Sequence, residues 1–497
     1  MRFFSIKKLP LLLCACLLLC TGCEDPHPVR SYLQKLGMVD PDEYRDEPET
    51  GTDWSGSIPG IWSPQQTQAP LPEEPVTPIA AEVLEPEPVD EDAVNSSVDE
   101  LIQRMRQQTG LDAWDTAASS ETGAGVGIEV ETTEDAYSDA AAQRTRNAIG
   151  LTTAGIRQTR AELSGLYAYE HLSDEGQGLY AEIYTILTMR GEDIVISTLD
   201  EKVMDIVYHF VIADHPELFY VDGYSYTRYK RGDRLVKIGF GGIYNCSEQI
   251  QEARAQKLEE NAQQWLAGLP AGADQYEIAK YIYEKVIEHT EYVPDAPENQ
   301  QITSVLLYGA SVCQGYARAM QYLLNLCRVE ATLVTGDVEG GPHAWVLALI
   351  DGSYTYIDPT WGDASYQVAE GGAGDNTKFP MINYSYLCVT SQELSRTHTV
   401  TDIVPQPACT DMSVNYYVRE GEYFIEFDTS ALAKLFERRY GDGSNNVTIK
   451  CSTRELYDTM VDSLIRKQGI MGYLRGENTS FSYSLLEDQY TIIVWLS

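Results

Sequence analysis

Basic residues are scarce in this chain of 497 residues. Lysine and arginine together number 36, against 75 aspartates and glutamates, which leaves a formal net charge of −39 at pH 7. A protein that binds nucleic acid needs a basic surface that displaces counterions from the phosphates. The charge balance therefore argues against a nucleic-acid partner, although it does not identify a substrate.

Motifs for metals and cofactors are also lacking. The cysteines beyond residue 23 are widely separated, and they form neither a C-x-x-C pair nor a pattern with histidine at the spacing of a zinc site. These six cysteines are Cys246, Cys313, Cys327, Cys388, Cys409 and Cys451. No nucleotide, flavin or haem motif is present, and the segment 442–446 lacks the downstream acidic residue of a calcium loop. We therefore expect neither a cofactor nor a metal.

No apolar run reaches the roughly 20 residues that are needed to cross a bilayer. A short run from Leu9 to Leu19 follows two lysines and ends in Cys20-Thr21-Gly22-Cys23, which predicts a signal peptide over residues 1–22. A cysteine after a small pair resembles a bacterial lipoprotein box. The resemblance implies that Cys23 carries lipid and holds the protein on the extracytoplasmic face of a bacterial cell membrane. Ordinary signal cleavage nearby, with Cys23 as a plain thiol, is the alternative.

The segment that follows is rich in acid and proline. Residues 24–150 contain 27 aspartates and glutamates against 7 lysines and arginines, a net charge of −20, and 12 of the 22 prolines fall between residues 26 and 88. Such a segment buries too little apolar surface to offset its ordering entropy. We predict that residues 23–150 form a disordered, self-repelling stalk between the lipid and the folded part of the chain.

Regular patterning begins near Thr153. Apolar residues recur at helical spacing over 153–190 and 203–213, and a hairpin about the turn at 231–233 follows, so we predict an accessory α+β unit over 153–262. At the other end, residues 410–497 predict a small α+β domain with helices on one face of its sheet and a strand over 413–427. No motif in the C-terminal domain indicates chemistry, so we interpret it as an interaction or shielding domain.

The segment between these units contains a cysteine at a helix start. Ser311 and Gln314 fit an S-x-x-Q capping box, which places Cys313 in the first turn of an amphipathic helix whose inner face begins at Tyr316. The free N–H groups and the dipole at this end of a helix stabilise a thiolate, which is the nucleophilic form of cysteine. Cys313 is therefore a candidate nucleophile.

A histidine and an aspartate follow on a predicted hairpin. His343 opens a strand that runs to Ile350, Asp351-Gly352 is a two-residue turn signal, and residues 353–360 form the return strand. In this register His343 faces Thr360, and Asp358 lies diagonally within reach on the same face. Thiol, imidazole and carboxylate are the groups of acyl-transfer chemistry. We interpret His289 and His398, by contrast, as structural.

Three motifs make a family resemblance specific. They are Val312-Cys313-Gln314-Gly315-Tyr316-Ala317, His343-Ala344-Trp345-Val346 and Tyr356-Ile357-Asp358-Pro359-Thr360-Trp361-Gly362-Asp363. In order and spacing they resemble those of the transglutaminase-like superfamily. The segments 215–219 and 391–398 are also similar to those of exported bacterial members, so the resemblance covers about residues 153–400. It implies a papain-like catalytic domain over 263–400, in which a helix carrying the cysteine packs on an antiparallel sheet carrying the histidine and aspartate.

The resemblance also assigns roles. Cys313 is implied as the nucleophile, His343 as the general base and acid, and Asp358 as the orienting carboxylate. Animal members of the family use an upstream tryptophan to help hold the oxyanion, and residues 266–312 contain none. The backbone N–H of Cys313 and, more weakly, the hydroxyl of Tyr308 are the candidates for that role here.

Two functions follow from these observations. The first is a membrane-anchored surface thiol enzyme that attacks an amide of a protein or peptide, for which cell-wall peptide is one candidate. It then resolves the thioester with water, which we favour, or with an amine, which gives a crosslink. The second is a catalytically weak or inert surface binding or scaffold protein on the same fold. The intact triad favours the first, whereas the missing tryptophan and the large additional domains favour the second.

Overall fold

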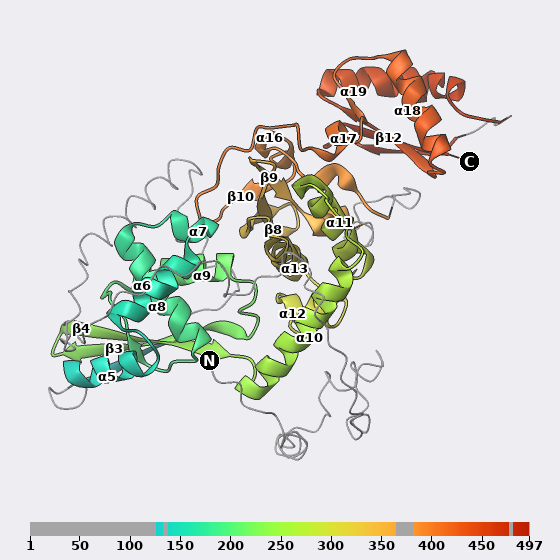
Figure 1. Ribbon diagram of the computed structural model, residues 1–497. Helices are drawn as coiled ribbons and strands as arrows, with labels where there is room; N and C mark the ends of the chain where they lie inside the picture. The colour runs from blue at the N-terminus through green and yellow to red at the C-terminus, as the bar shows by residue number, and fades with distance from the viewer. Residues whose placement is uncertain (1–125, 133–137, 364–380, 477–480, 497) are drawn as a thin grey trace, which may run out of the picture. The chain divides into compact units, whose positions relative to one another are not determined.

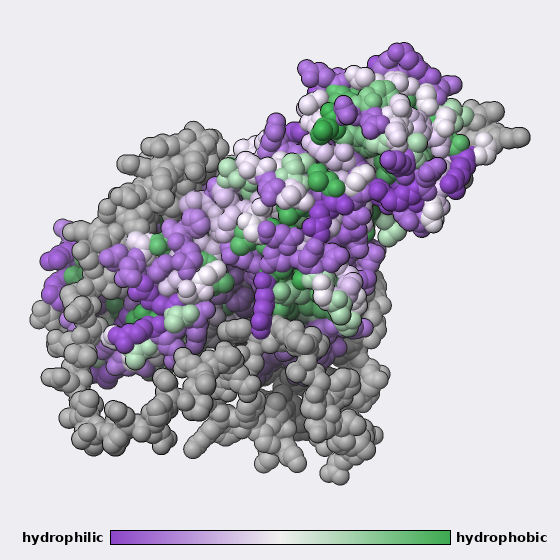
Figure 2. Space-filling model, turned by 45° about the horizontal axis from the view of Figure 1, so that its top comes forward, coloured by the Kyte–Doolittle hydropathy of each residue, from purple (hydrophilic) through white to green (hydrophobic). Residues whose placement is uncertain are grey.

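The computed structural model describes residues 126–132, 138–363, 381–476 and 481–496 (Figure 1). The predicted signal peptide and lipidation site, and residues 23–125 of the predicted stalk, lie outside the described residues. No helix within the described ranges combines the length and the apolar character that crossing a bilayer requires. On the face shown in Figure 2, hydrophilic side chains cover much of the described surface and hydrophobic residues form small separate patches.

The accessory unit is a four-stranded sheet with helices, in the strand order β1-β3-β4-β2. Its strands are β1 (Val126–Glu131), β2 (Ile194–Val195), β3 (Val221–Arg231) and β4 (Arg234–Tyr244). Its helices are α5 (Asp139–Ala148), α6 (Thr153–Leu163), α7 (Tyr167–Glu170), α8 (Asp174–Thr188) and α9 (Glu201–Asp214). The β3–β4 hairpin closes where we predicted its turn, with Gly232 at a φ of 61°.

The folded part begins earlier than we predicted, because β1 and α5 both lie within the predicted stalk over 23–150. β1 forms a parallel ladder with β3 in which Val126 pairs with Ser225, almost a hundred residues away. The prediction of the stalk used only the local amino-acid composition, which gives no information about a strand partner so far away in the sequence. α5 buries only Ala142 among its ten residues, so its apolar pattern was too weak to identify.

The central domain is a four-stranded sheet with the order β10-β7-β8-β9, antiparallel throughout. Its strands are β7 (Ala331–Val338), β8 (Gly341–Ile350), β9 (Ser353–Ile357) and β10 (Thr399–Val400), and a separate pair is formed by β5 (Glu291–Tyr292) and β6 (Ala310–Ser311). Its helices are α10 (Glu248–Leu266), α11 (Gln275–Glu288), α12 (Ile302–Leu306), α13 (Cys313–Leu326), α14 (Pro359–Gly362), the 3₁₀ turn η2 (Tyr384–Tyr386) and α16 (Ser391–Leu394).

The helix α13 packs on β8 and β7 and supplies the centre of the core (Figure 1). Tyr316, Met320, Leu323 and Leu324, which we predicted for its inner face, are fully buried, whereas Cys327 is half-buried just past its end. Burying side chains of this size contributes about 1.5–3 kcal/mol each. The core is therefore papain-like, with a cysteine-bearing helix on an antiparallel sheet.

The C-terminal domain contains a second mixed sheet, in the order β11-β12-β14-β13. Its elements are α17 (Tyr416–Arg419), β11 (Tyr423–Phe424), α18 (Thr429–Gly441), β12 (Asn446–Cys451), α19 (Arg454–Met460), the π-helical turn η3 (Val461–Arg466), the 3₁₀ turn η4 (Gly469–Gly472), β13 (Tyr483–Leu486) and β14 (Thr491–Trp495). α18 and α19 lie on one face of the sheet (Figure 1). The prediction of a strand over 413–427 was wrong, because Asn415 caps the short helix α17 and only β11 is extended there.

The pairing of β10 with β7 depends on a glycine. A β-carbon at Gly336 would lie 2.2 Å from the backbone oxygen of Thr399 and 2.6 Å from the ring of Trp345. Neither neighbour is the end of a flexible side chain, so a larger residue would force the two strands apart.

We expect Gly336→Ala to lower the free energy of unfolding by about 1–3 kcal/mol, the usual range for overpacking a core. Gly178→Ala, inside α8 with open space around its β-carbon, is the matched control and should stabilise by up to about 1 kcal/mol. Urea denaturation followed by circular dichroism measures both. Equal effects of the two substitutions would contradict the close approach of β10.

Candidate active site

The cysteine side of the site is built at the start of α13. Cys313 is the first residue of this 14-residue helix and is half-buried. The predicted capping box is wrong, because Val312 is the N-cap and no side chain caps the helix. Ser311 instead donates to the carbonyl of Asn299 at 2.7 Å. The first N–H groups of a helix have no intrahelical acceptor, so that of Cys313 is available to an oxyanion.

The first turn of α13 contains Gly315 because no larger residue fits at this position. A β-carbon at this position would lie 1.9 Å from the hydroxyl of Ser311 and 2.7 Å from the carbonyl of Asn299. The loop before α13 therefore packs directly on the first turn of the helix. This contact fixes the start of the helix, and with it the position of Cys313.

The histidine and the aspartate come from the predicted hairpin. Ile350 pairs with Ser353 across the Asp351-Gly352 turn, as predicted, and the ladder continues to Val346 and Ile357. The return strand ends there rather than at Thr360, because Pro359 begins the one-turn helix α14. Asp358 is the N-cap of that helix, so its side chain turns toward the helix start instead of following the strand.

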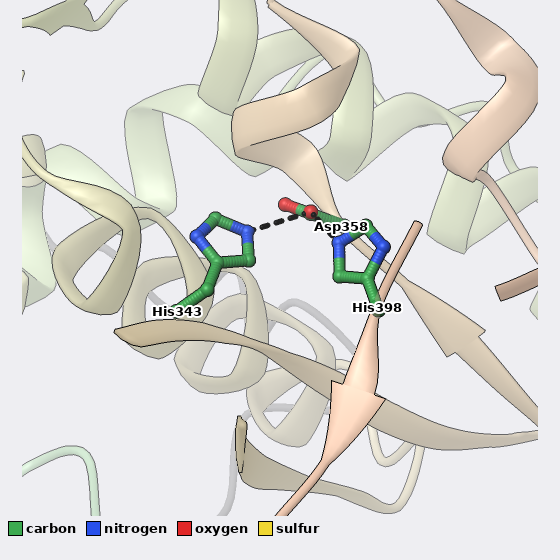
Figure 3. A group of neighbouring side chains, drawn as sticks. All are labelled: His343, Asp358 and His398. Carbon is green, nitrogen blue, oxygen red and sulfur yellow. Dashed lines mark hydrogen bonds and ion pairs between the residues drawn. The ribbon is translucent and has the colours of Figure 1, made fainter. Parts of the chain in front are cut away.

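The structure brings the imidazole of His343 against the carboxylate of Asp358. The distance from Nε2 of His343 to Oδ2 of Asp358 is 2.8 Å, and both side chains are almost completely buried (Figure 3). Since Nε2 faces the carboxylate, Nδ1 is the ring nitrogen left for the thiol, and the interaction of Cys313 with His343 contributes to raising the pKa of the imidazole. The three residues predicted from the motifs therefore lie in one chain of contacts.

The charges in this chain are mutually dependent. Burial by itself lowers the pKa of His343, but the charge of Asp358, the hydrogen bond to it and the contact with Cys313 together raise that pKa well above 6.5. Burial likewise opposes ionisation of Asp358, yet the charge of His343 and the hydrogen bonds from both histidines lower the pKa of this carboxyl. The arrangement favours an imidazolium held by a carboxylate.

A second histidine, which the sequence reasoning dismissed as structural, joins the same carboxylate. Nε2 of His398 lies 3.0 Å from Oδ2 of Asp358, opposite His343 (Figure 3). Burial lowers the pKa of His398, and its Nδ1 lies 2.8 Å from the hydroxyl of Thr397, which suits a neutral ring that donates through Nε2. In the sequence, only the similarity of the segment 391–398 to members of the family indicated that His398 could belong to the site.

Aromatic rings surround the two histidines. Trp345 is fully buried beside both, with ring centroids 6.0 Å from His343 and 5.1 Å from His398. Trp361 is half-buried and lies 6.3 Å from His343. These rings exclude water from the His343–Asp358 contact, which strengthens it. The interpretation of Trp345 and Trp361 as core and cleft wall is consistent with these positions.

The other sequence candidate, Tyr308, lies in different surroundings. Its buried hydroxyl interacts with the guanidinium of Arg254 and the carboxylate of Glu298. Its oxyanion role stays a prediction. Cys23, the candidate lipidation site, falls outside the described residues.

The cluster of His343, Asp358 and His398 also deserves comparison with a metal site, since its three ligand atoms lie within 4.8 Å of one another. Tetrahedral zinc with bonds of about 2.0–2.1 Å holds neighbouring ligand atoms roughly 3.3 Å apart. Here the two nitrogen–oxygen distances are 2.8 and 3.0 Å, and both end on one carboxylate oxygen. These distances fit two hydrogen bonds to a shared acceptor better than ligands around a metal.

Comparison with known proteins identifies the central domain. Residues 263–359 match the model of the transglutaminase-like superfamily, so this part of the chain is a transglutaminase-like domain. No protein with curated annotation matches the chain significantly.

Three solved structures illustrate the partial similarity of this chain to known folds. A transglutaminase has 14% sequence identity and a TM-score of 0.21, and the match covers 32% of this chain and 53% of the other. A candidate cysteine protease from Cytophaga hutchinsonii has 18% identity and a TM-score of 0.19, and the match covers 23% of this chain and 43% of the other. The periplasmic domain of TgpA from Pseudomonas aeruginosa has 16% identity and a TM-score of 0.18, and the match covers 28% of this chain and 58% of the other. The chain thus spans about half the length of each of these three structures.

We expect Asp358→Asn to lower the pKa of His343 below 6.5, because burial then acts without the opposing charge. NMR titration of the histidine rings, compared between the wild-type and Asp358→Asn proteins, measures this shift. An unaltered His343 titration would show that Asp358 does not set its charge.

The same pair predicts a pH window for stability. Because the pKa of His343 is raised on folding, its contribution to stability is complete below about pH 6.5 and is lost as the pH rises through the raised pKa. Because the pKa of Asp358 is lowered on folding, its contribution to stability is complete above about pH 3.8 and is lost as the pH falls through the lowered pKa. The cost of Asp358→Asn, about 3–5 kcal/mol for a broken buried pair, should therefore be largest between these values. Urea denaturation at a series of pH values measures it.

Proposed function

We propose that this chain, with its transglutaminase-like domain, is a thiol enzyme that transfers acyl groups from amides through Cys313, His343 and Asp358. The observation that carries the proposal is the continuous contact from the thiol through one imidazole to a buried carboxylate. Nucleophile, base and orienting group are the three parts that this chemistry needs.

The first half-reaction forms a thioester. The thiolate of Cys313 attacks the amide carbon, the backbone N–H of Cys313 donates to the oxyanion, and the C–N bond breaks. His343, protonated and held by Asp358, donates its Nδ1 proton to the leaving amine, which departs neutral. This step requires a charged imidazole, and the raised pKa of His343 supplies one at neutral pH.

The second half-reaction returns the thiol. Neutral His343 accepts a proton from water, the hydroxide adds to the thioester carbon, and the C–S bond breaks to release a carboxylic acid. An amine in place of water gives a new amide, and thus a crosslink. We favour hydrolysis because water is the default acceptor at an exported site, and a protein or peptide, such as a cell-wall peptide, is the proposed substrate.

We further propose that the enzyme acts outside the cytoplasm while anchored to a bacterial membrane. The support is the lysine pair, the short apolar run and the terminal Thr21-Gly22-Cys23, which together resemble a lipoprotein signal. In this proposal the acidic, proline-rich segment spaces the enzyme from the bilayer.

The test of the thiol enzyme is pH-dependent alkylation of residues 24–497. We expect iodoacetamide to label Cys313 rapidly at pH 6, where an ordinary cysteine of pKa about 8.5 is almost wholly protonated. His343→Ala should slow this labelling at least about tenfold, because the imidazolium that stabilises the thiolate is gone. Mass spectrometry of the labelled peptides gives the rates.

Cys246 and Cys327 are the internal controls, since both are half-buried and burial raises the pKa of each thiol. They should stay unlabelled at pH 6 in both chains. Labelling of Cys313 that follows free-thiol behaviour, with or without His343, would instead support the inert binding or scaffold protein.

The anchor has a separate test. In a bacterial host that processes lipoproteins, we expect Cys23→Ala to move the protein from the membrane fraction to the soluble extracytoplasmic fraction. Cys20→Ala, which leaves the acceptor thiol intact, is the control and should stay with the membrane. A Cys23→Ala protein that remains membrane-bound would refute lipidation at this residue.

A further inference from the structure

A cavity of about 300 Å³ lies beside the first turns of α13, where this helix meets α9 and the start of β3. Its polar lining includes Tyr208, Asp222, Gln301, Gln314 and Arg318. None of these side chains belongs to the triad.

The cavity and Cys313 are connected by α13, because two residues of this helix line the cavity and Cys313 is its first residue. Gln314 directly follows Cys313, and Arg318 lies four residues further on, so that Gln314 and Arg318 share one face of α13 about 6 Å apart along the axis. Cys313 itself is not part of the lining, so a substrate whose amide is at Cys313 would reach the cavity across the first turn of α13.

Arg318 is an unusual buried cation. Its side chain is only 3% exposed, its Nη1 donates to the amide oxygen of Gln301 at 2.5 Å, and its Nε has no hydrogen-bond partner among the described residues. Burial lowers the pKa of Arg318 to about 10, so the guanidinium remains charged at neutral pH. A buried charge and an unused buried donor each cost stability unless something compensates them.

The neighbouring acids do not serve as its ion-pair partner. Glu298 is paired with Arg254 at 2.6 Å, and the carboxylate of Asp222 accepts from Asn245 at 3.0 Å. Asp222 and Glu217 act on Arg318 only through longer-range charge. Asp222 and Glu298 also line the cavity, but within the described part of the chain the guanidinium of Arg318 forms no salt bridge with either.

We propose that this cavity is a substrate subsite in which Arg318 binds a carboxylate of the amide substrate next to Cys313. The inference rests on the proposed acyl-transfer function and specifies its substrate class as acidic peptides or amides. A planar guanidinium with free donors matches a carboxylate geometrically, and Gln301 and Tyr208 add polar contacts around it. The carboxylate can be a side chain or a chain terminus.

Affinity labels distinguish these sources. The reagents are iodoacetyl-glycine and iodoacetyl-glycyl-glycine, with a terminal carboxylate, and iodoacetyl-aspartate and iodoacetyl-glutamate α-amides, with a side-chain carboxylate. Each is paired with the neutral reagent in which that carboxylate is a carboxamide. We expect at least one acidic reagent to label Cys313 of the full chain about tenfold faster than its neutral partner, the gain expected from a charge-assisted hydrogen bond.

Two variants assign the preference to Arg318. Arg318→Gln removes the charge, and Gln314→Glu places a carboxylate one helical turn before Arg318, where it pairs with the guanidinium internally. Both should reduce the ratio of acidic to neutral labelling to about one or below. Gln314→Glu removes the preference without leaving a cavity, so it decides the question even if Arg318→Gln fails to fold.

The labelling rates test the carboxylate subsite and the proposed acyl-transfer activity separately. Labelling is measured at pH 6 and at pH 8.5, where an unactivated accessible thiol also reacts. A carboxamide preference in every pair at both pH values, or a carboxylate preference that survives Gln314→Glu, would overturn the subsite. Slow labelling at pH 6 with a carboxylate preference at pH 8.5 would overturn the proposed activity while retaining the subsite.

Discussion

The carboxylate of Asp358 is the acceptor on which the rest of the site depends. Its Oδ1 receives the backbone N–H groups of Thr360 and Trp361, at 2.9 and 3.2 Å, and its Oδ2 receives the rings of His343 and His398. Four donors satisfy a fully buried charge that would otherwise be expensive. One carboxylate thereby joins the end of the hairpin, the turn of α14 and the start of β10, and it holds the imidazole of His343 in one orientation.

This arrangement continues into the C-terminal domain. Tyr386 lies 5.6 Å from the ring of His398, and its hydroxyl accepts from the side chain of Gln489 at 3.3 Å. Lys450, on β12, is fully buried and lies 3.4 Å from a carboxylate oxygen of Glu393, which forms the capping box of α16 with the N-cap Thr390. Removing either partner of a buried pair leaves the other charge uncompensated. The C-terminal domain therefore has a structural connection to the wall behind the triad, in addition to the interaction or shielding role that we inferred from its lack of motifs.

Local sequence predicted the elements that carry the chemistry and failed where a distant contact decides the conformation. The hairpin turn at Asp351 follows from its two-residue signal, and α13 does begin at Cys313, although the capping box that we used to place its start is absent. The shared acceptor was not predictable in this way, because His398 reaches Asp358 across 40 residues. The predicted continuation of the β8–β9 ladder to Thr360 was also wrong, because Pro359 ends the strand. The side chain of Asp358 is therefore oriented by its role as the N-cap of α14 and not by diagonal pairing across the two strands.

His398 lies beyond the segment by which the domain is recognised. The family match ends at residue 359, whereas three of the four donors to the carboxylate of Asp358 lie beyond it, namely the N–H groups of Thr360 and Trp361 and the ring of His398. A fragment cut at the recognised boundary would keep the thiol, the imidazole and the carboxylate but lose part of what holds them in register. The segment that contains the whole hydrogen-bonded cluster is thus longer than the segment that matches the family, and its limit is set by hydrogen bonding rather than by motif.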